Sequence, residues 1–539
     1  MASTAYTRPS KPPGPLGERR QPRLAKELGR IEPKKLGIGL VAGCCLALLT
    51  YISFARLFAI YSPVFESTSL VMKNGPPASK TVPGTEAVPV QEKIEVDGEK
   101  ELAKDEAETK EPSFPDEEKI EVKEEPLPES EKEEVVVAKP DVGVKAEAKM
   151  TCDENAVDEG FPYARPSVCE LTGEVRISPP EKTMFFINPS GAGPFDENGE
   201  KKIRPYARKD TFLLPGVVEV TIKSVPSSES GAPACARQHD VPAVVFSTAG
   251  YTDNFFHDNT DVMIPLFLST AHFAGEVQFL ITNYKPWWMK KYAPLLKKLS
   301  NYEVINFDKE EAVHCFPGGQ LGLYRDRDLI IGPHPTRNPH NYTMVDYNRF
   351  LRRAFGLPRD VPTVLGEKTG ARPKMLMIER KGTRKLLNLH AVAALCEQLG
   401  FDVTVSEAGG DVREFAEKVN SADVLLAVHG AGMTNQIFLP TRAVLVQIVP
   451  WGKMDWMATN FYGQPAKDMQ LRYVEYYVSE EETTLKDKYS RDHYVFKDPM
   501  AIHGQGWPAI AEIIMKQDVI VNETRFKPFL LKALDQLQD

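Results

Sequence analysis

Cysteine is scarce in this chain of 539 residues, and the few cysteines present do not form a metal-binding pattern. There are seven of them, and their spacing fits none of the paired arrangements that bind zinc. Positive charge is not in excess either, because 66 basic residues face 75 acidic ones and the formal net charge is −9. The composition therefore gives no support to a structural zinc site and indicates no nucleic-acid partner.

Charge is absent from residues 36–55, and the apolar character resumes after Arg56. About 20 apolar residues are enough to span a bilayer as a helix. The tail before them, residues 1–35, is basic, so the positive-inside rule places it in the cytosol and the rest of the chain in the lumen. A cleaved signal peptide is the rival interpretation, but the run is long, starts late and has no clear cleavage site after it. We predict a transmembrane signal anchor at 36–61.

Aromatic residues are almost missing from the next segment, residues 62–150, which Pro, Glu, Lys and Val dominate. Such a composition cannot bury enough apolar surface to offset the entropy lost on ordering. We therefore predict a disordered acidic stalk that acts as a solvated spacer, although its acidic runs could contact a basic partner.

About 390 residues remain after the stalk, too many for one ordinary core. We predict two domains, at 151–350 and 351–539. In both, short apolar runs such as Ala243–Ser247 and Lys374–Ile378 alternate with stretches of helical periodicity. This alternation is typical of parallel, doubly wound sheets, whose ligands bind at the carboxyl ends of the strands.

Five cysteines follow the stalk, on the luminal side where disulfides persist. Cys152 and Cys169 flank a short loop-rich stretch and form the predicted pair. Cys235 is expected to pair with either Cys315 or Cys396, which leaves one cysteine free.

Two N-glycosylation sequons are intact, at Asn341 and Asn522. A third, at Asn188, is blocked by proline. If the body is luminal, both intact sequons should lie in surface loops.

The run Asp423–Val428 is apolar and ends in a polar, glycine-rich corner, after which the sequence continues as a helical turn. Backbone N–H groups at such a turn, with the positive end of a helix dipole behind them, suit a phosphate group. Gly430 and Gly432 have no Cβ, so a ligand can approach the main chain closely. Many strand–helix turns are glycine-rich for steric reasons alone, so ligand binding and a plain structural turn both stay open.

Three blocks of the sequence resemble glycosyltransferase family 61, a plant group that decorates xylan. They are Asn254–Asp261 before an apolar helix, Glu379–Arg384 with Asn388, and His429–Asn435. Their order and spacing are similar to those of the family across roughly residues 150–520, and the basic head is similar to grass xylan arabinosyltransferases. The resemblance implies a GT-B fold with two Rossmann-like domains facing a cleft, an inverting mechanism and a UDP-sugar donor, without a cofactor.

Inversion at the anomeric carbon requires a base on the acceptor hydroxyl and groups that stabilise the departing diphosphate. The resemblance makes Asp261 the first choice of base, because it occupies the acidic position of the family's Asn-x-x-His-x-x-x-Asp/Glu pattern. His257 is the alternative base, or it orients the acceptor or Asp261. Structural roles stay open for both, as a carboxylate at a helix amino end and as a packed loop histidine. The role of Asp258 is left undecided.

Basic and glycine-rich positions are predicted to bind the donor. Arg380 and Arg384 follow a predicted strand, where guanidinium groups can grip phosphate, unless they are plain surface arginines. Glu407, at the end of another strand, is expected either to accept from a ribose hydroxyl or to be solvated. Trp451 could line a uracil or sugar site but more often such a tryptophan packs. The turn supplies the other predicted donor-site residues: His429, Gly430, Ala431, Gly432, Thr434 and Asn435.

The motif Asp326-Arg327-Asp328 has the Asp-x-Asp form by which other glycosyltransferases hold manganese. It lies between arginines before an apolar run, and a pattern this short arises easily by chance. His334 and His340 lie in a proline-rich loop without a third spaced ligand. We predict no metal site.

Together with the resemblance, these features predict a Golgi type II membrane glycosyltransferase that transfers a pentose by inversion. The main expectation is arabinofuranose, from UDP-arabinofuranose, onto O-3 of xylosyl residues in arabinoxylan. A xylosyltransferase that adds a xylose side chain to xylan, a protein O-glycosyltransferase and a non-catalytic Golgi scaffold are the alternatives. The expected partners are the UDP-sugar, the xylan acceptor, the Golgi membrane and other xylan synthases.

Overall fold

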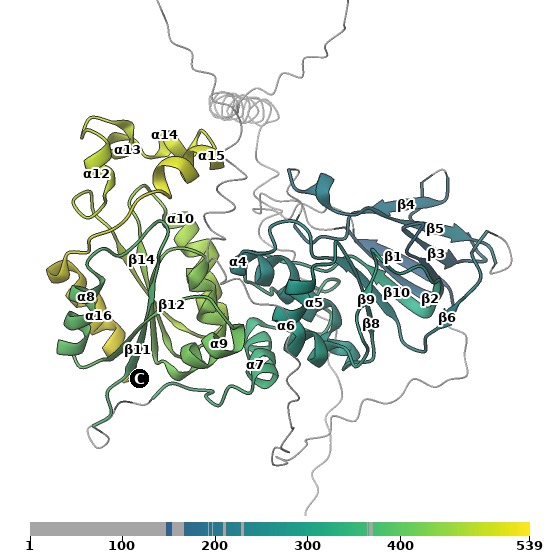
Figure 1. The fold of residues 1–539 in the computed structure, drawn as a ribbon, viewed down its shortest axis with the longest axis horizontal. Coiled ribbons are helices and arrows are strands. Elements are labelled where there is room, and N and C mark those ends of the chain that lie inside the picture. The colour runs from purple at the N-terminus through teal and green to yellow at the C-terminus, as the bar shows by residue number, and fades with distance from the viewer. Residues whose placement is uncertain are drawn as a thin grey trace, which may run out of the picture. The chain divides into compact units, whose positions relative to one another are not determined.

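The computed structural model describes residues 147–153 and 167–538, except for 192, 197, 209–211, 228–230, 364 and 366–369. The predicted tail, anchor and nearly all of the predicted stalk lie outside these residues. Among the described residues, no helix combines the length and the apolar character needed to cross a membrane. All of them fall into one contact unit of the chain, and two β-sheets organise it (Figure 1).

The first sheet is mixed, with the order β4-β5-β3-β2-β10-β7-β8-β9, while β1 pairs with β2 and β6 with β10. Strands β10, β7, β8 and β9 form its longest run of parallel pairs, the arrangement that the alternation predicted. The strands are β1 (Lys149–Asp153), β2 (Val168–Ser178), β3 (Thr183–Ile187), β4 (Glu200–Ile203), β5 (Val220–Val225), β6 (Arg237–Gln238), β7 (Ala243–Ser247), β8 (Gln278–Thr282), β9 (Ile305–Asn306) and β10 (His314–Leu321).

The predicted Rossmann-like character of residues 151–350 is therefore only partly correct. The link between β2 and β3 is too short for a crossover, so these two strands pair antiparallel. Strand β10 pairs antiparallel with β2 and parallel with β7, joining the two parts of the sheet. Its register shifts between Phe316 and Gly318, where the exposed Pro317 avoids the ladder.

The second sheet is entirely parallel, with the order β12-β11-β13-β14-β15. The chain reverses its direction of winding between β11 and β13, which is the switch point where ligands of such sheets bind. The bounds are β11 (Lys374–Glu379), β12 (Asp402–Glu407), β13 (Val424–Val428), β14 (Val444–Val449) and β15 (Arg472–Tyr477).

Helices cover both faces of this second sheet (Figure 1). Alternate residues of β11 point to opposite sides: Met375 and Met377 pack with α8 (Leu389–Gln398) and α16 (Glu523–Asp535). Leu376 and Ile378 pack in the cluster that holds α9 (Val412–Ser421) and the 3-10 segment η5 (Ala431–Phe438). The remaining helical segments are η2 (Leu214–Gly216), α4 (Phe255–His257), η3 (Asp258–Met263), α5 (Ile264–Thr270), η4 (Ala271–Phe273), α6 (Pro286–Leu299), α7 (Met344–Phe355), α10 (Asp455–Ala458), η6 (Thr459–Gly463), α11 (Gln464–Asp468), α12 (Leu485–Lys488), α13 (Tyr494–Lys497), α14 (Met500–His503), α15 (Trp507–Ala509) and η7 (Ile510–Ile514).

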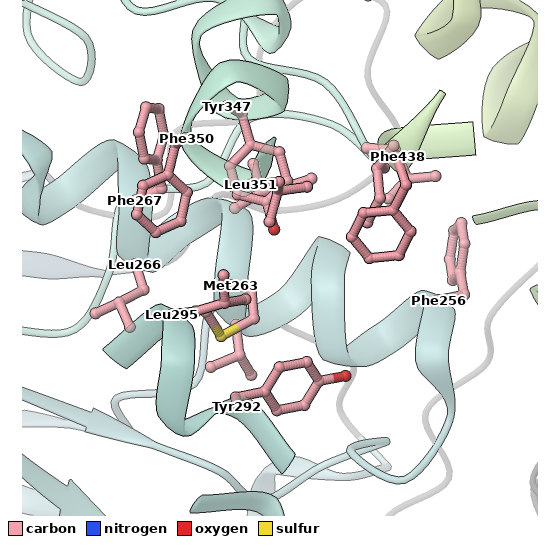
Figure 2. Packing of buried hydrophobic residues seen from close by; sticks show 14 of the residues in the cluster. Phe256, Met263, Leu266, Phe267, Tyr292, Leu295, Tyr347, Phe350, Leu351 and Phe438 are labelled. Atoms are coloured by element: carbon pink, nitrogen blue, oxygen red, sulfur yellow. The ribbon is translucent and has the colours of Figure 1, made fainter. Parts of the chain in front are cut away.

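One apolar cluster runs from the helices of the first sheet to those of the second (Figure 2). Phe267 of α5 packs on Tyr347 and Phe350 of α7, with ring centroids 5.4 and 5.2 Å apart. Phe255 of α4 lies 6.3 Å from Phe438 of η5. This packing brings the segment 254–261 next to the glycine-rich turn that begins η5, although about 170 residues separate them in the sequence.

Disulfides join Cys152 to Cys169, the predicted pair, and Cys235 to Cys315, one of the two alternatives left open. Cys396 is a buried thiol, and burial raises its pKa to about 12.

Both sequon asparagines are exposed. Asn341 lies in a loop, as predicted, whereas Asn522 is the N-cap residue of α16. Their glycosylation stays a prediction.

Candidate functional site

The segment that follows β7 places a histidine and an aspartate on the same side of a helical turn. Asn254 caps α4 by accepting a hydrogen bond from the Phe256 backbone N–H. The helix then widens into the π-turn η3, a feature often found at functional sites. Residues four apart are neighbours on such a turn, and His257 Nδ1 lies 2.8 Å from Asp261 Oδ2.

Asp261 is fully buried, and every approach to its carboxylate is occupied. The Tyr206 hydroxyl donates to it at 2.8 Å, Arg208 Nε donates at 2.9 and 3.0 Å, and Arg325 Nε lies 3.6 Å away. Burial alone would raise the pKa of Asp261, but the charges of Arg208, His257 and Arg325 outweigh it and hold that pKa well below its usual range. The carboxylate is therefore ionised, yet it faces the protein interior.

This environment differs from the one expected for Asp261 as the base. A carboxylate surrounded by two arginines, a tyrosine and a histidine is a poor proton acceptor and has no open side toward a substrate. The geometry favours His257, the alternative base, with Asp261 orienting its ring.

The His257 ring is partly exposed, with 17% of its side chain accessible. Its edge rests against Tyr251 and Phe256, with ring centroids 4.6 and 5.2 Å away. Because an ionised carboxylate accepts from Nδ1, the proton of the neutral ring belongs on Nδ1. Nε2 then carries a lone pair that can accept a proton from a bound hydroxyl group.

A second carboxylate, Asp328, completes the buried ionic network. Arg208 donates to it at 2.7 Å, Arg325 also bonds to it, and Thr260 Oγ1 donates to it at 3.3 Å. Asp328 of the Asp-x-Asp motif therefore pairs with Arg208 and Arg325, the two arginines that also pair with Asp261. Among the residues that the structure describes, no group of three or more His, Cys, Asp or Glu side chains is arranged to hold a metal ion.

Asp258, whose role the sequence left undecided, is a structural anchor. It is buried and accepts from Trp288 Nε1 at 3.0 Å, from the Tyr292 hydroxyl at 2.8 Å and from Lys291 Nζ at 3.2 Å. All three donors belong to α6, so Asp258 fixes the turn that carries His257 and Asp261 to that helix.

Across from this turn, the predicted donor residues gather at the carboxyl ends of β11 and β13. Gly430 has a φ of 151°, and a Cβ added to it would lie 2.3 Å from an Arg380 guanidinium nitrogen. The arginine therefore lies directly over the turn, and only glycine leaves room for it. Arg380 Nε also donates to the Thr383 carbonyl at 2.9 Å, which orients the guanidinium.

His429 is buried at the end of β13 and is held as a neutral ring. Burial and the charges of Arg384 and Arg380 lower its pKa well below the usual value. Gln447 donates to Nδ1 at 2.7 Å, while the Tyr473 hydroxyl donates to the amide oxygen of Gln447 at 2.6 Å. Nε2 is consequently the protonated nitrogen, and His429 can act as a hydrogen-bond donor.

The other predicted donor residues are less directly placed. Arg384 is buried: its backbone N–H donates to the Gln517 carbonyl, and a guanidinium nitrogen lies 2.8 Å from Met515 Sδ. Its charge helps to lower the pKa of His429. Glu407 is exposed at the end of β12.

Within η5, Ala431 and Gly432 are half-buried, and Thr434 and Asn435 are buried. Asn435 Nδ2 donates to the Gly432 carbonyl at 2.9 Å and so stiffens the turn. Trp451 packs in the core, where its Nε1 donates to the Val495 carbonyl at 2.9 Å.

Phe461 connects the two halves of the site. Its ring lies 5.5 Å from Phe256, the neighbour of His257, and 6.5 Å from His429. The sequence did not predict that Phe461, Tyr206, Arg208, Arg325 and Gln447 belong to the site. Of these, only Arg325 carried a signal, because it adjoins the Asp-x-Asp motif.

Comparison with known proteins places this site within a described family. The model of the family Glycosyltransferase 61 matches residues 255–446, which include both halves of the site. The chain is 65% identical to the beta-1,2-xylosyltransferase XAX1 of Oryza sativa subsp. japonica, over 100% of both chains. It is 46% identical to the alpha-1,3-arabinosyltransferase XAT3 of the same organism, over 73% of this chain and 66% of the relative. With the beta-1,2-xylosyltransferase XYXT1 of that organism the identity is 40%, over 73% of this chain and 85% of the relative.

Proposed function

The chain belongs to glycosyltransferase family 61 and is a glycosyltransferase, and on this premise we propose that it transfers xylose from UDP-xylose to the backbone of xylan. The observation that carries the choice of sugar is the 65% identity, along the whole chain, to a beta-1,2-xylosyltransferase. The arabinosyltransferase relative, which fits the main expectation from the sequence, is 46% identical over 73% of the chain. Xylose therefore replaces arabinofuranose as the first candidate.

The proposed reaction is a single displacement at the anomeric carbon. His257 Nε2 takes the proton of a xylan hydroxyl while the hydroxyl oxygen bonds to the anomeric carbon. The bond from that carbon to the diphosphate oxygen breaks, and UDP leaves with the electron pair. Such a displacement inverts an α-linked donor to a β-linked product. The β linkage in the names of two relatives supports this stereochemistry.

Each charge that develops in the proposed reaction lies near a group of opposite charge or near hydrogen-bond donors. The imidazolium formed at His257 lies 2.8 Å from the Asp261 carboxylate, which stabilises it. The diphosphate is stabilised by Arg380, by the Nε2–H of His429 and by the backbone N–H groups after Gly430. In this proposal the base follows a strand of the first sheet and the donor groups follow strands of the second, which is the arrangement expected of a GT-B architecture.

The experiment that tests the function is product analysis with two donors. Purified full-length chain is incubated with xylohexaose and either UDP-xylose or UDP-arabinofuranose, and the products are analysed by mass spectrometry and NMR. We expect a β-linked xylosyl branch from UDP-xylose. An arabinofuranosyl branch on O-3 would overturn the sugar but keep the polysaccharide, whereas no transfer from either donor to xylohexaose would overturn the function.

Because the base and the donor-binding groups are proposed to lie in different halves of the site, one substitution should affect turnover and another should affect UDP affinity. Removing a general base typically costs about 10²–10⁴-fold in rate, so His257→Ala should slow transfer that much while leaving UDP affinity unchanged. Arg380→Ala should weaken UDP binding by about 1.5–3 kcal/mol, roughly ten- to a hundredfold, because it removes a charge-assisted phosphate contact. Turnover and calorimetric UDP affinity are measured for both.

The matched control is Lys381→Ala, next to Arg380 but 58% exposed and paired with Glu379, which should change neither quantity. Asp261→Asn should reduce turnover with UDP affinity retained, because the amide cannot stabilise the imidazolium. If Asp261→Asn abolishes transfer and His257→Ala leaves it near normal, Asp261 is the base after all.

We also propose that the chain is a single-pass type II protein of the Golgi membrane. The support is the uncharged segment at 36–55 and the basic tail before it. Protease treatment of sealed microsomes should then remove only the tail and leave a protected body glycosylated at Asn341 and Asn522. Digestion of the body under these conditions would contradict the orientation.

A further inference from the structure

The segment after β14 presents an aromatic and polar surface beside the proposed active site. Trp456 of α10 is 41% exposed, and Thr459 and Asn460 of η6 are exposed as well. Residues three and four apart lie on one side of a helix, so these side chains share a face. Half-buried Phe461 borders it. We call these four residues the Trp456 face.

The indole ring of Trp456 is held in place although it is exposed. Its Nε1 donates to His503 Nδ1 at 3.5 Å, and His503 Nε2 in turn donates to the Gly452 carbonyl at 2.7 Å. The ring of Phe461 meets it edge to face, with centroids 5.9 Å apart. A ring that is fixed before a ligand arrives loses little entropy on binding, which is the property of a stacking platform.

The Trp456 face begins where the two halves of the active site meet. Phe461 contacts Trp456 on one side, while its other neighbours are Phe256, next to His257, and His429 of the donor half. A polymer that places one sugar at His257 would therefore carry a neighbouring sugar over this surface.

The charge of the surface fits a neutral sugar better than a nucleotide. Between residues 453 and 463 the charged side chains are Lys453 and Asp455, and their charges cancel. The one other ionisable side chain in this stretch is the weakly acidic Tyr462. The charges of Arg384 and Arg380 lie instead near His429, in the proposed donor half, where they help to lower the pKa of that histidine. A xylose ring has no hydroxymethyl branch, so its C–H face can lie flat on an indole while its hydroxyls reach Thr459 and Asn460.

We propose that the Trp456 face binds a non-reacting xylosyl residue of the acceptor backbone and so makes the enzyme favour a polymer over a single sugar. The inference rests on the proposed function, because it takes xylan as the acceptor. It adds a second acceptor subsite, on the sheet that otherwise binds the donor.

The test compares long and short acceptors in the full-length chain. For Trp456→Ala the KM for xylohexaose should rise about tenfold, as expected for a lost stacking contact, with UDP affinity unchanged. The KM for methyl β-xyloside, a single ring that cannot reach from His257 to the Trp456 face, should not change. Trp456→Phe should recover part of the loss. Tyr302→Ala is the control, since Tyr302 is 38% exposed but bonds to Glu276 at the amino end of β8, away from the site.

Two results would overturn the inference. An equal rise in KM for both acceptors would mean that Trp456 only supports the reacting sugar, and a loss of UDP affinity would mean that it stacks on the nucleotide. If wild-type protein transfers nothing to xylan, the proposed function fails separately. In that case the affinity of xylohexaose for wild-type and Trp456→Ala protein, measured by calorimetry, still tests the subsite. Equal affinities for the two proteins would contradict it.

Discussion

An ionised carboxylate buried among arginines is the constraint on which the rest of the candidate active site depends. Taking the charge of Asp261 out of water is costly unless it is paired and hydrogen-bonded. Arg208, Arg325 and Tyr206 provide that compensation, and Asp328 balances the second arginine charge. Oδ2 of Asp261, which also accepts from Tyr206 and Arg208, lies 2.8 Å from His257 Nδ1. The orientation of His257, the proposed base, thus depends on this buried network, and removing Arg208 or Arg325 would leave buried carboxylate charge less well compensated.

The candidate site also requires that two motifs distant in sequence, residues 254–261 and 429–435, lie next to each other. The apolar cluster achieves this by packing Phe255 and Phe256 of α4 against Phe438 of η5 and Phe461 of η6. Because η5 starts at the glycine-rich turn, the same contacts that stabilise the core also fix the distance between base and leaving-group site. Catalytic geometry and stability are therefore coupled in this region, and core substitutions here should affect turnover as well as folding.

The second sheet could be predicted from the sequence because its strands are buried on both faces and appear as continuous apolar runs. The mixed character of the first sheet could not, since β10 contains Pro317, Gly318 and Gly319, which read as a turn. The sequence also predicted which segments form the site and which family they resemble. It predicted only some of the roles of the individual residues. An aspartate early in a helix suggests an exposed carboxylate, and nothing near Asp261 in sequence reveals that Tyr206, Arg208 and Arg325 enclose it. Burial of a charge depends on residues far away in the chain.

The proposed role of His257 requires one tautomer of its neutral ring, with the proton on Nδ1 and the lone pair on Nε2. This can be measured directly by ¹⁵N NMR of the full-length chain labelled at its ten histidines, with a His257→Gln variant to assign the signals. For the neutral ring we predict a protonated-type shift for Nδ1 and an unprotonated-type shift for Nε2. In Asp261→Asn protein this preference should be lost. A wild-type His257 with its proton on Nε2 would contradict the account, because that nitrogen could not then accept the proton of the acceptor hydroxyl.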